Sequence, residues 1–275
     1  MHYVYLEVTL TSQANPTQPV PYTGTLADNI ARIALDIGEG MLKSDAEVHR
    51  VEIAIEKICR AYGAVHVDVF TIQSLILVAV HMPDGSHSTQ SRRIFTNSPN
   101  LSRIEAYNAL SRRICAEKPP VLEVDEEIRR IKATSAYPFW LTLLGNMLGA
   151  GSFAVFFGGT VRDGIAAAII GVVVAILNSV NPKNFNKMVK TLLISLISGL
   201  ISCFAVRIGL GDNLDMILIG EIMLMIPGLS LGNAMRDLLW GDTLTGSSKV
   251  IQAVIVAVMI AVGLSLALLI AGGGL

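Results

Sequence analysis

The sequence predicts a membrane protein in which an N-terminal cytoplasmic α+β domain is followed by a transmembrane bundle of five α-helices. Hydrophobic residues make up 52% of the 275 residues and charged residues only 16%, whereas soluble domains average about 25% charged residues. The charges are also unevenly placed. Residues 1–137 hold 14 of the 21 Lys and Arg residues and 16 of the 22 Asp and Glu residues. This asymmetry predicts a soluble first half and a membrane-embedded second half.

The first 120 residues divide into a lead-in and a folded domain. Residues 1–24 contain three closely spaced prolines and are expected to be flexible. The domain, residues 25–120, opens with two predicted helices, at 25–43 and 45–62, each with an apolar stripe at helical spacing. Ser44 and Glu47 have the S-x-x-E spacing of a capping box, which predicts that they start the second helix.

The pattern then changes to the period of two that is typical of β-strands. Alternation at 65–70 and an apolar run at 75–82 predict two strands, and a polar segment at 87–95 predicts an edge strand. A third helix is expected at 100–116. Residues 121–137 are expected to form a charged linker helix that leads to the membrane.

Residues 138–275 form the predicted transmembrane domain. Five apolar segments each approach the ~20 residues needed to cross a bilayer, and they lie at 138–157, 164–180, 188–210, 214–231 and 250–271. With the N-terminus in the cytoplasm, five basic residues fall on cytoplasmic loops and two on outer loops. The positive-inside rule therefore predicts a multi-pass protein of the plasma membrane, with its N-terminus inside and its C-terminus outside.

Several function classes are disfavoured. The net charge of −1 gives no electrostatic case for nucleic acid. The three cysteines have no C-x-x-C spacing, so no disulfide framework, metal site or cofactor is expected. The G-x-S-x-G pattern at 228–232 lies in an apolar segment with no histidine after His87, which argues against a serine hydrolase and predicts that the chain is not an enzyme.

The fourth apolar segment carries the sharpest functional hypothesis. Pro227 lacks a backbone donor and is followed by Gly228, so the helix is expected to break there. The free N–H groups of a new half-helix attract anions such as a carboxylate. Broken helices of this kind recur at the binding sites of transporters.

Polar residues after the break are the candidate substrate site. Asn233, Arg236 and Asp237 are spaced i, i+3 and i+4, which places them on one helix face, and Asp242 follows. Arg236 can bind a carboxylate through two hydrogen bonds. The alternative is that Arg236 pairs with Asp237 or Asp242 and serves only as an anchor at the membrane interface.

Glu221 is a candidate for proton coupling. It lies inside an apolar segment, where an acid is costly and is by default a functional hypothesis. Its rival role is a hydrogen-bonding contact between helices.

Two segments resemble the threonine/serine exporter family. Residues 227–246 read PGLSLGNAMRDLLWGDTLTG, and residues 43–70 read KSDAEVHRVEIAIEKICRAYGAVHVDVF. Asp45 stands where that family usually has glycine. The layout, a soluble domain and five spans, is similar to the larger subunit of the family's split, two-component type, which includes succinate exporters.

The resemblance implies export of threonine and serine, or of a C4 dicarboxylate such as succinate. It also implies a small membrane partner of four or five spans, and hence a hetero-oligomer. A secondary transporter driven by the proton gradient is expected, because the chain has no nucleotide-binding P-loop. The alternative function is a membrane-anchored sensor or scaffold whose cytosolic domain binds a partner.

Overall fold

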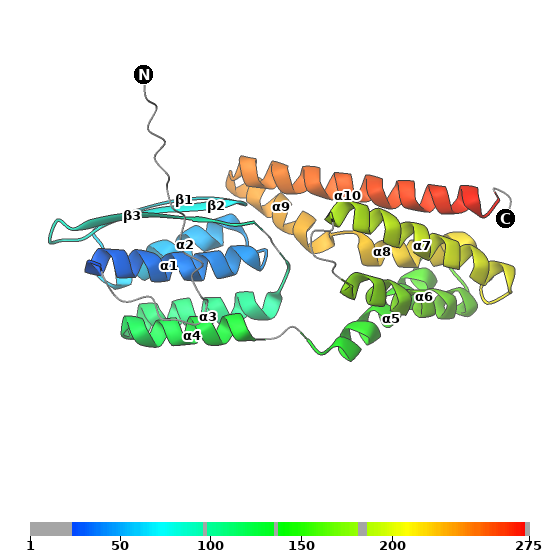
Figure 1. Cartoon of the computed structure of the whole chain (residues 1–275), viewed down its shortest axis with the longest axis horizontal. Helices are drawn as coiled ribbons and strands as arrows, with labels where there is room; N and C mark the ends of the chain where they lie inside the picture. The colour runs from blue at the N-terminus through cyan, green and yellow to red at the C-terminus, as the bar shows by residue number, and fades with distance from the viewer. Residues whose placement is uncertain (1–23, 96–97, 135–136, 181–185, 273–275) are drawn as a thin grey trace, which may run out of the picture.

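The computed structural model describes residues 24–95, 98–134, 137–180 and 186–272. The lead-in expected at 1–24 lies outside these residues except for Gly24. Two halves lie end to end along the long axis of the molecule (Figure 1). The N-terminal half holds α1–α4 and β1–β3, and the C-terminal half holds α5–α10.

Three layers build the N-terminal half. A sheet of three antiparallel strands, β1 (His66–Ile72), β2 (Leu75–His81) and β3 (His87–Arg93), has the order β1-β2-β3. Helices α1 (Leu26–Lys43) and α2 (Val48–Ala61) cover one face of this sheet, and α3 (Leu101–Glu117) and α4 (Val121–Ala133) pack beneath them (Figure 1).

The alternation along the strands decides which face of the sheet is covered. Ile76, Val78 and Val80 are buried against α1 and α2, while Phe70 and Leu77 are exposed on the other face. Because successive side chains in a strand point to opposite faces, the sheet contributes one apolar face to the core. The region expected as a charged linker holds α4, which buries three side chains in the same core: Val124, Ile128 and Ile131.

The predicted capping box at the start of the second helix is wrong. The Ser44 hydroxyl donates to the carbonyl of Gly40 at 2.8 Å and so belongs to the end of α1. Helix α2 begins only at Val48, with Glu47 as its N-cap residue and no hydrogen bond from the Glu47 side chain. Residues 44–47 form a loop instead, in which Asp45 has a φ of 69°. In this loop the side chain and the backbone carbonyl of Asp45 accept hydrogen bonds from α9.

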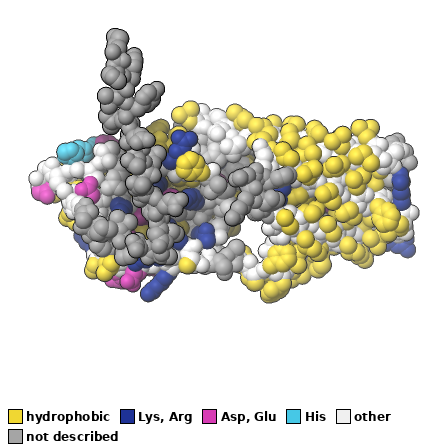
Figure 2. Space-filling model, viewed as in Figure 1, with side chains coloured by type: hydrophobic (Ala, Val, Ile, Leu, Met, Phe, Trp, Pro, Cys, Tyr) yellow, Lys and Arg dark blue, Asp and Glu magenta, His cyan; other side chains and the backbone are white. Residues whose placement is uncertain are grey.

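Six helices make up the described C-terminal half: α5 (Phe139–Phe156), α6 (Val161–Ser179), α7 (Lys187–Arg207), α8 (Leu214–Met225), α9 (Gly228–Trp240) and α10 (Thr243–Ile270). Four of them are long and apolar enough to cross a membrane, and α8 with α9 counts as a fifth span if the bent pair is one segment. Figure 2 shows apolar side chains gathered over this half. The chain is therefore a multi-pass membrane protein by the length and composition of its helices.

The fourth predicted span consists of two helices, α8 and α9, which meet at Pro227. Helix α8 ends at Met225, α9 begins at Gly228, and the two meet at 55°. Pro227 stands between them and cannot donate the hydrogen bond that a continuous helix needs. With 12 residues, α8 is about 18 Å long and by itself falls short of the ~30 Å hydrocarbon core.

Small residues allow α8 to approach α5 closely. A Cβ atom added at Gly220 would lie 2.5 Å from the carbonyl oxygen of Ala150 and 3.2 Å from the Cβ of Ala154. The first of these neighbours is backbone, so it cannot turn away. Gly232, on α9, has no atom within 4 Å of the same position.

We therefore expect Gly220→Ala to destabilise the bundle by about 1–3 kcal/mol, because the added methyl group forces α5 and α8 apart. Gly232→Ala is the matched control, since alanine favours the helix by up to about 1 kcal/mol and meets nothing there. Thermal denaturation of the purified protein in detergent measures both. Equal melting temperatures for the two variants would contradict the close contact between α5 and α8.

Candidate functional site

The candidate residues on α9 face the loop between α1 and α2, residues 44–47. The Asn233 side chain donates to the backbone carbonyl of Asp45 at 2.8 Å, and Arg236 donates to a Glu47 carboxylate oxygen at 2.8 Å. Asn233 is buried, whereas the Arg236 side chain is 61% exposed. The two segments that carry the family resemblance thus bind each other. This face of α9 is occupied largely by the N-terminal half of the same chain.

Asp237 binds a free backbone N–H group at the start of α2. Its Oδ1 accepts a hydrogen bond from the backbone N–H of Val48 at 3.1 Å, across a sequence separation of 189 residues. The first N–H groups of a helix have no partner within the helix, and a negative charge there is favoured by the helix dipole. Asp237 therefore supplies the cap that the Glu47 side chain does not.

A buried lysine joins Asp237 to the loop. Lys249, near the start of α10, donates to Asp237 Oδ2 at 3.0 Å, and its Nζ lies 3.6 Å from Asp45 Oδ1. The side chains of all three residues are at most 5% exposed. With both carboxyls ionised, two negative charges share one positive charge in this cluster, which we call the buried charge triad.

The remaining contacts between the halves surround the triad. His49 stacks on Trp240 with ring centroids 4.4 Å apart. Gln73, in the turn between β1 and β2, exchanges amide hydrogen bonds with Gln252 on α10 at 3.2 and 3.3 Å. These contacts extend the interface along α9 and α10.

Asp242 lies just before α10 and is half-buried. Burial raises the pKa of its carboxyl above the ordinary value, the negative charge of Asp237 raises it further, and His49 opposes the shift. Asp242 therefore belongs to the same electrostatic environment as Asp237, although no side-chain hydrogen bond from it caps α10.

Glu221 lies elsewhere, within the helix bundle. The Ser202 hydroxyl on α7 lies 2.5 Å from Glu221 Oε1, and the carboxyl group is fully buried. Its second oxygen, Oε2, has no hydrogen-bond partner among the described residues. The sequence-predicted residues thus form two sites: one at the junction of the halves and one inside the bundle.

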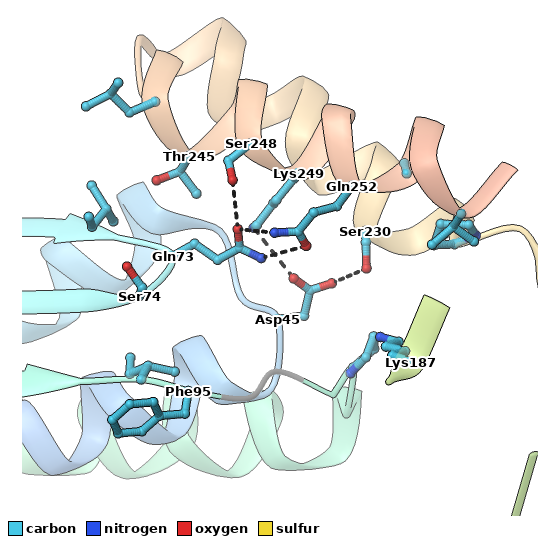
Figure 3. A pocket seen from close by; sticks show the side chains of 17 residues that line it. Asp45, Gln73, Ser74, Phe95, Lys187, Ser230, Thr245, Ser248, Lys249 and Gln252 are labelled. Carbon is cyan, nitrogen blue, oxygen red and sulfur yellow. Dashed lines mark hydrogen bonds and ion pairs between the residues drawn. The ribbon is translucent and has the colours of Figure 1, made fainter. Parts of the chain in front are cut away.

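A cavity of about 710 Å³ opens beside the triad, between the N-terminal half and α10 (Figure 3). Asp45 and Lys249 lie in its wall, and the first residue of α7, Lys187, reaches it from another side. Pro227 and Ser230, at the helix break, complete the contact with α9.

Sequence reasoning did not single out Asp45, Lys187 or Lys249 as members of a site. One signal for Lys249 was present: a lysine near the start of a long apolar helix needs a partner or a path to water. Asp45 lies inside the first family-like segment, but only the fold shows that its carboxylate faces α9 and α10.

We expect Lys249→Met to destabilise the protein by about 3–5 kcal/mol, because it leaves two buried carboxylates without their cation. Arg236→Ala is the control. Its pair with Glu47 is exposed on the arginine side, and such pairs contribute about 0–1 kcal/mol. Thermal denaturation in detergent checks both variants, and a Lys249→Met protein as stable as the Arg236→Ala protein would contradict the role of the triad.

Comparison with known proteins covers most of the chain. The family model described as "Putative threonine/serine exporter" matches residues 32–271. The "Threonine/serine exporter" of Corynebacterium glutamicum is 24% identical over 266 residues, covering 92% of this chain and 53% of the relative. The "Probable threonine/serine exporter" of Mycobacterium tuberculosis is 25% identical over 257 residues, covering 90% of this chain and 48% of the relative. No solved structure matches the chain.

The chain thus spans about half the length of the curated relatives it matches. The matched residues include the α1–α2 loop, the break between α8 and α9, and all of α10. Since the family model covers most of the sequence, the chain belongs to the threonine/serine exporter family.

Proposed function

We propose that the chain is a subunit of a secondary-active exporter in the plasma membrane that carries small carboxylate metabolites out of the cell. Threonine and serine are the first candidates, because the curated relatives carry these names, and a C4 dicarboxylate such as succinate is the second. Family membership supports the proposal, and so does the break between α8 and α9 next to a cavity with charged walls.

The proposed orientation places the N-terminal half in the cytoplasm and the C-terminus outside. In that orientation the α9 residues and the cavity face the side from which an exporter takes its substrate. The basic residues counted on the loops favour this arrangement.

A small membrane protein of four or five spans is the proposed partner. The layout of the chain, a soluble half followed by up to five spans, is similar to the larger subunit of the family's two-component type, and this likeness supports the proposed partner. Helix α5 offers a surface for this partner, since only 11% of the apolar stretch of α5 is buried within the chain.

We assign different roles to the four residues of the candidate site. Asn233 and Asp237 are committed to the α1–α2 loop, so their proposed role is to position α9. Arg236 remains largely exposed, which leaves its guanidinium able to bind a substrate carboxylate. Asp242 is proposed to lie next to Arg236 on the path of the substrate.

Export from membrane vesicles tests this function. Vesicles that contain the chain and its partner should release labelled threonine, serine or succinate, and Arg236→Ala should slow release by about tenfold or more, the loss expected for one charge-assisted contact. The variant should insert normally and keep its melting temperature. Release that is unaffected by the substitution would remove Arg236 from the substrate site.

Vesicles that release none of the three compounds, with or without the partner, would contradict export itself. They would favour the alternative, a membrane-anchored sensor or scaffold. The exposed arginine on α9 and the buried acid in the bundle favour transport, since an anchor needs neither.

Glu221 is the proposed proton carrier. Its Oε2 has no hydrogen-bond partner among the described residues, and its Oε1 accepts a hydrogen bond from the Ser202 hydroxyl. A buried carboxyl group with so little compensation favours the neutral, protonated form, and a conformation that exposes it to water would release the proton.

Glu221→Gln should therefore abolish or flatten the dependence of export on pH, because the amide cannot exchange a proton. Asp215→Asn on the same helix is the control, since Asp215 is an exposed residue in the first turn of α8. Initial rates of export at a series of pH values measure the effect. An unchanged pH profile in Glu221→Gln would remove this residue from the proton path.

A further inference from the structure

Asp45 holds a backbone conformation that its side chain does not favour. Its φ is 69°, and of the described non-glycine residues only Lys118 shares a positive φ. The left-handed region is unfavourable for an ordinary L-residue, while glycine adopts it freely and aspartate more readily than most. The strain is retained at a site where the carboxylate is buried and bonded.

One oxygen of that carboxylate remains available. Oδ2 accepts a hydrogen bond from the Ser230 hydroxyl at 2.6 Å. Lys249 Nζ lies 3.6 Å from Oδ1, which is longer than a hydrogen bond, and it donates to Asp237 at 3.0 Å instead. Within the described residues, Oδ1 therefore lacks a donor, and Asp45 lies in the wall of the cavity (Figure 3).

The charge triad lacks one positive charge. Asp45 and Asp237 share the ammonium group of Lys249, while Arg236 lies on the exposed side of the interface and pairs with Glu47. A buried charge is stable only when it is paired and hydrogen-bonded. A ligand that carries an ammonium group could bind Oδ1 and balance the triad.

A second charge is positioned for the opposite end of such a ligand. Lys187 lines the same cavity, is exposed, and forms no ion pair with another described residue. Its ammonium group can bind a carboxylate. The amides of Gln73 and Gln252 supply both donors and acceptors in the same wall, and Ile72 and Val256 provide apolar surface.

We infer that this cavity binds a free α-amino acid, with its ammonium group on Asp45 Oδ1 and its carboxylate on Lys187. A dicarboxylate fits this site poorly, because its second carboxylate would face Asp45 instead of a cation. That the bound amino acid is also the exported compound rests on the function proposed above.

The test uses the full chain, purified in detergent, with L-threonine, L-serine and succinate as ligands in titration calorimetry. Asp45→Asn keeps the shape of the side chain, tolerates the left-handed backbone and can still accept the Ser230 bond, but it removes the charge. Threonine or serine should bind the wild type, and Asp45→Asn should weaken this binding by about tenfold or more. Lys187→Gln should weaken it as well, whereas Asp84→Asn, on the exposed turn between β2 and β3, should not.

Three results would overturn the inference: no amino acid binds the wild type, Asp45→Asn binds it equally well, or succinate competes on equal terms. Melting temperatures identify a variant that has lost its fold, and Lys187→Gln, which removes an exposed side chain, then provides the second measurement. Vesicle export separates the two proposals. Normal export of threonine by Asp45→Asn would reject the cavity site alone, while binding without export would reject the exporter function alone.

Discussion

The carboxylate of Asp237 is the contact on which the arrangement of the two halves depends. It accepts the N–H of Val48 at the start of α2 and the ammonium group of Lys249 on α10. Because the group is completely buried, neither bond can be replaced by water, so both partners must be in place at once. Direct contact between α2 and α9 is otherwise sparse. Polar bonds, more than apolar area, therefore fix how these two helices meet.

Sequence periodicity was sufficient to predict the elements but not their interface. The strands followed from alternation and the break between α8 and α9 followed from Pro227, since both depend on neighbours along the chain. The capping box at Ser44 and Glu47 failed although its spacing was correct. The Ser44 N–H bonds instead to the end of α1. The first N–H of α2, that of Val48, bonds to Asp237, 189 positions away, and a local rule contains no information about such a partner.

The candidate site was likewise predicted only in part from the sequence. Helical spacing correctly placed Asn233, Arg236 and Asp237 together, but it could not show that this face binds the chain's own α1–α2 loop. Asp45 and Lys249 become members of a site only when the fold brings α1 and α10 together. A buried lysine beside two acids is a tertiary arrangement, and sequence alone gives only the hint that an isolated charge near an apolar helix needs a partner.

Helix α10 connects the junction of the two halves to the far end of the helix bundle. It is continuous over 28 residues, which corresponds to about 42 Å, while the hydrocarbon core is only ~30 Å thick. It runs from the buried triad to the far end of the bundle and packs along α7 for much of the way (Figure 1). Because α10 is continuous, a tilt of the N-terminal half at the Lys249 end is expected to be passed along the helix to its opposite end. The fold thus provides a mechanical connection between the two membrane faces.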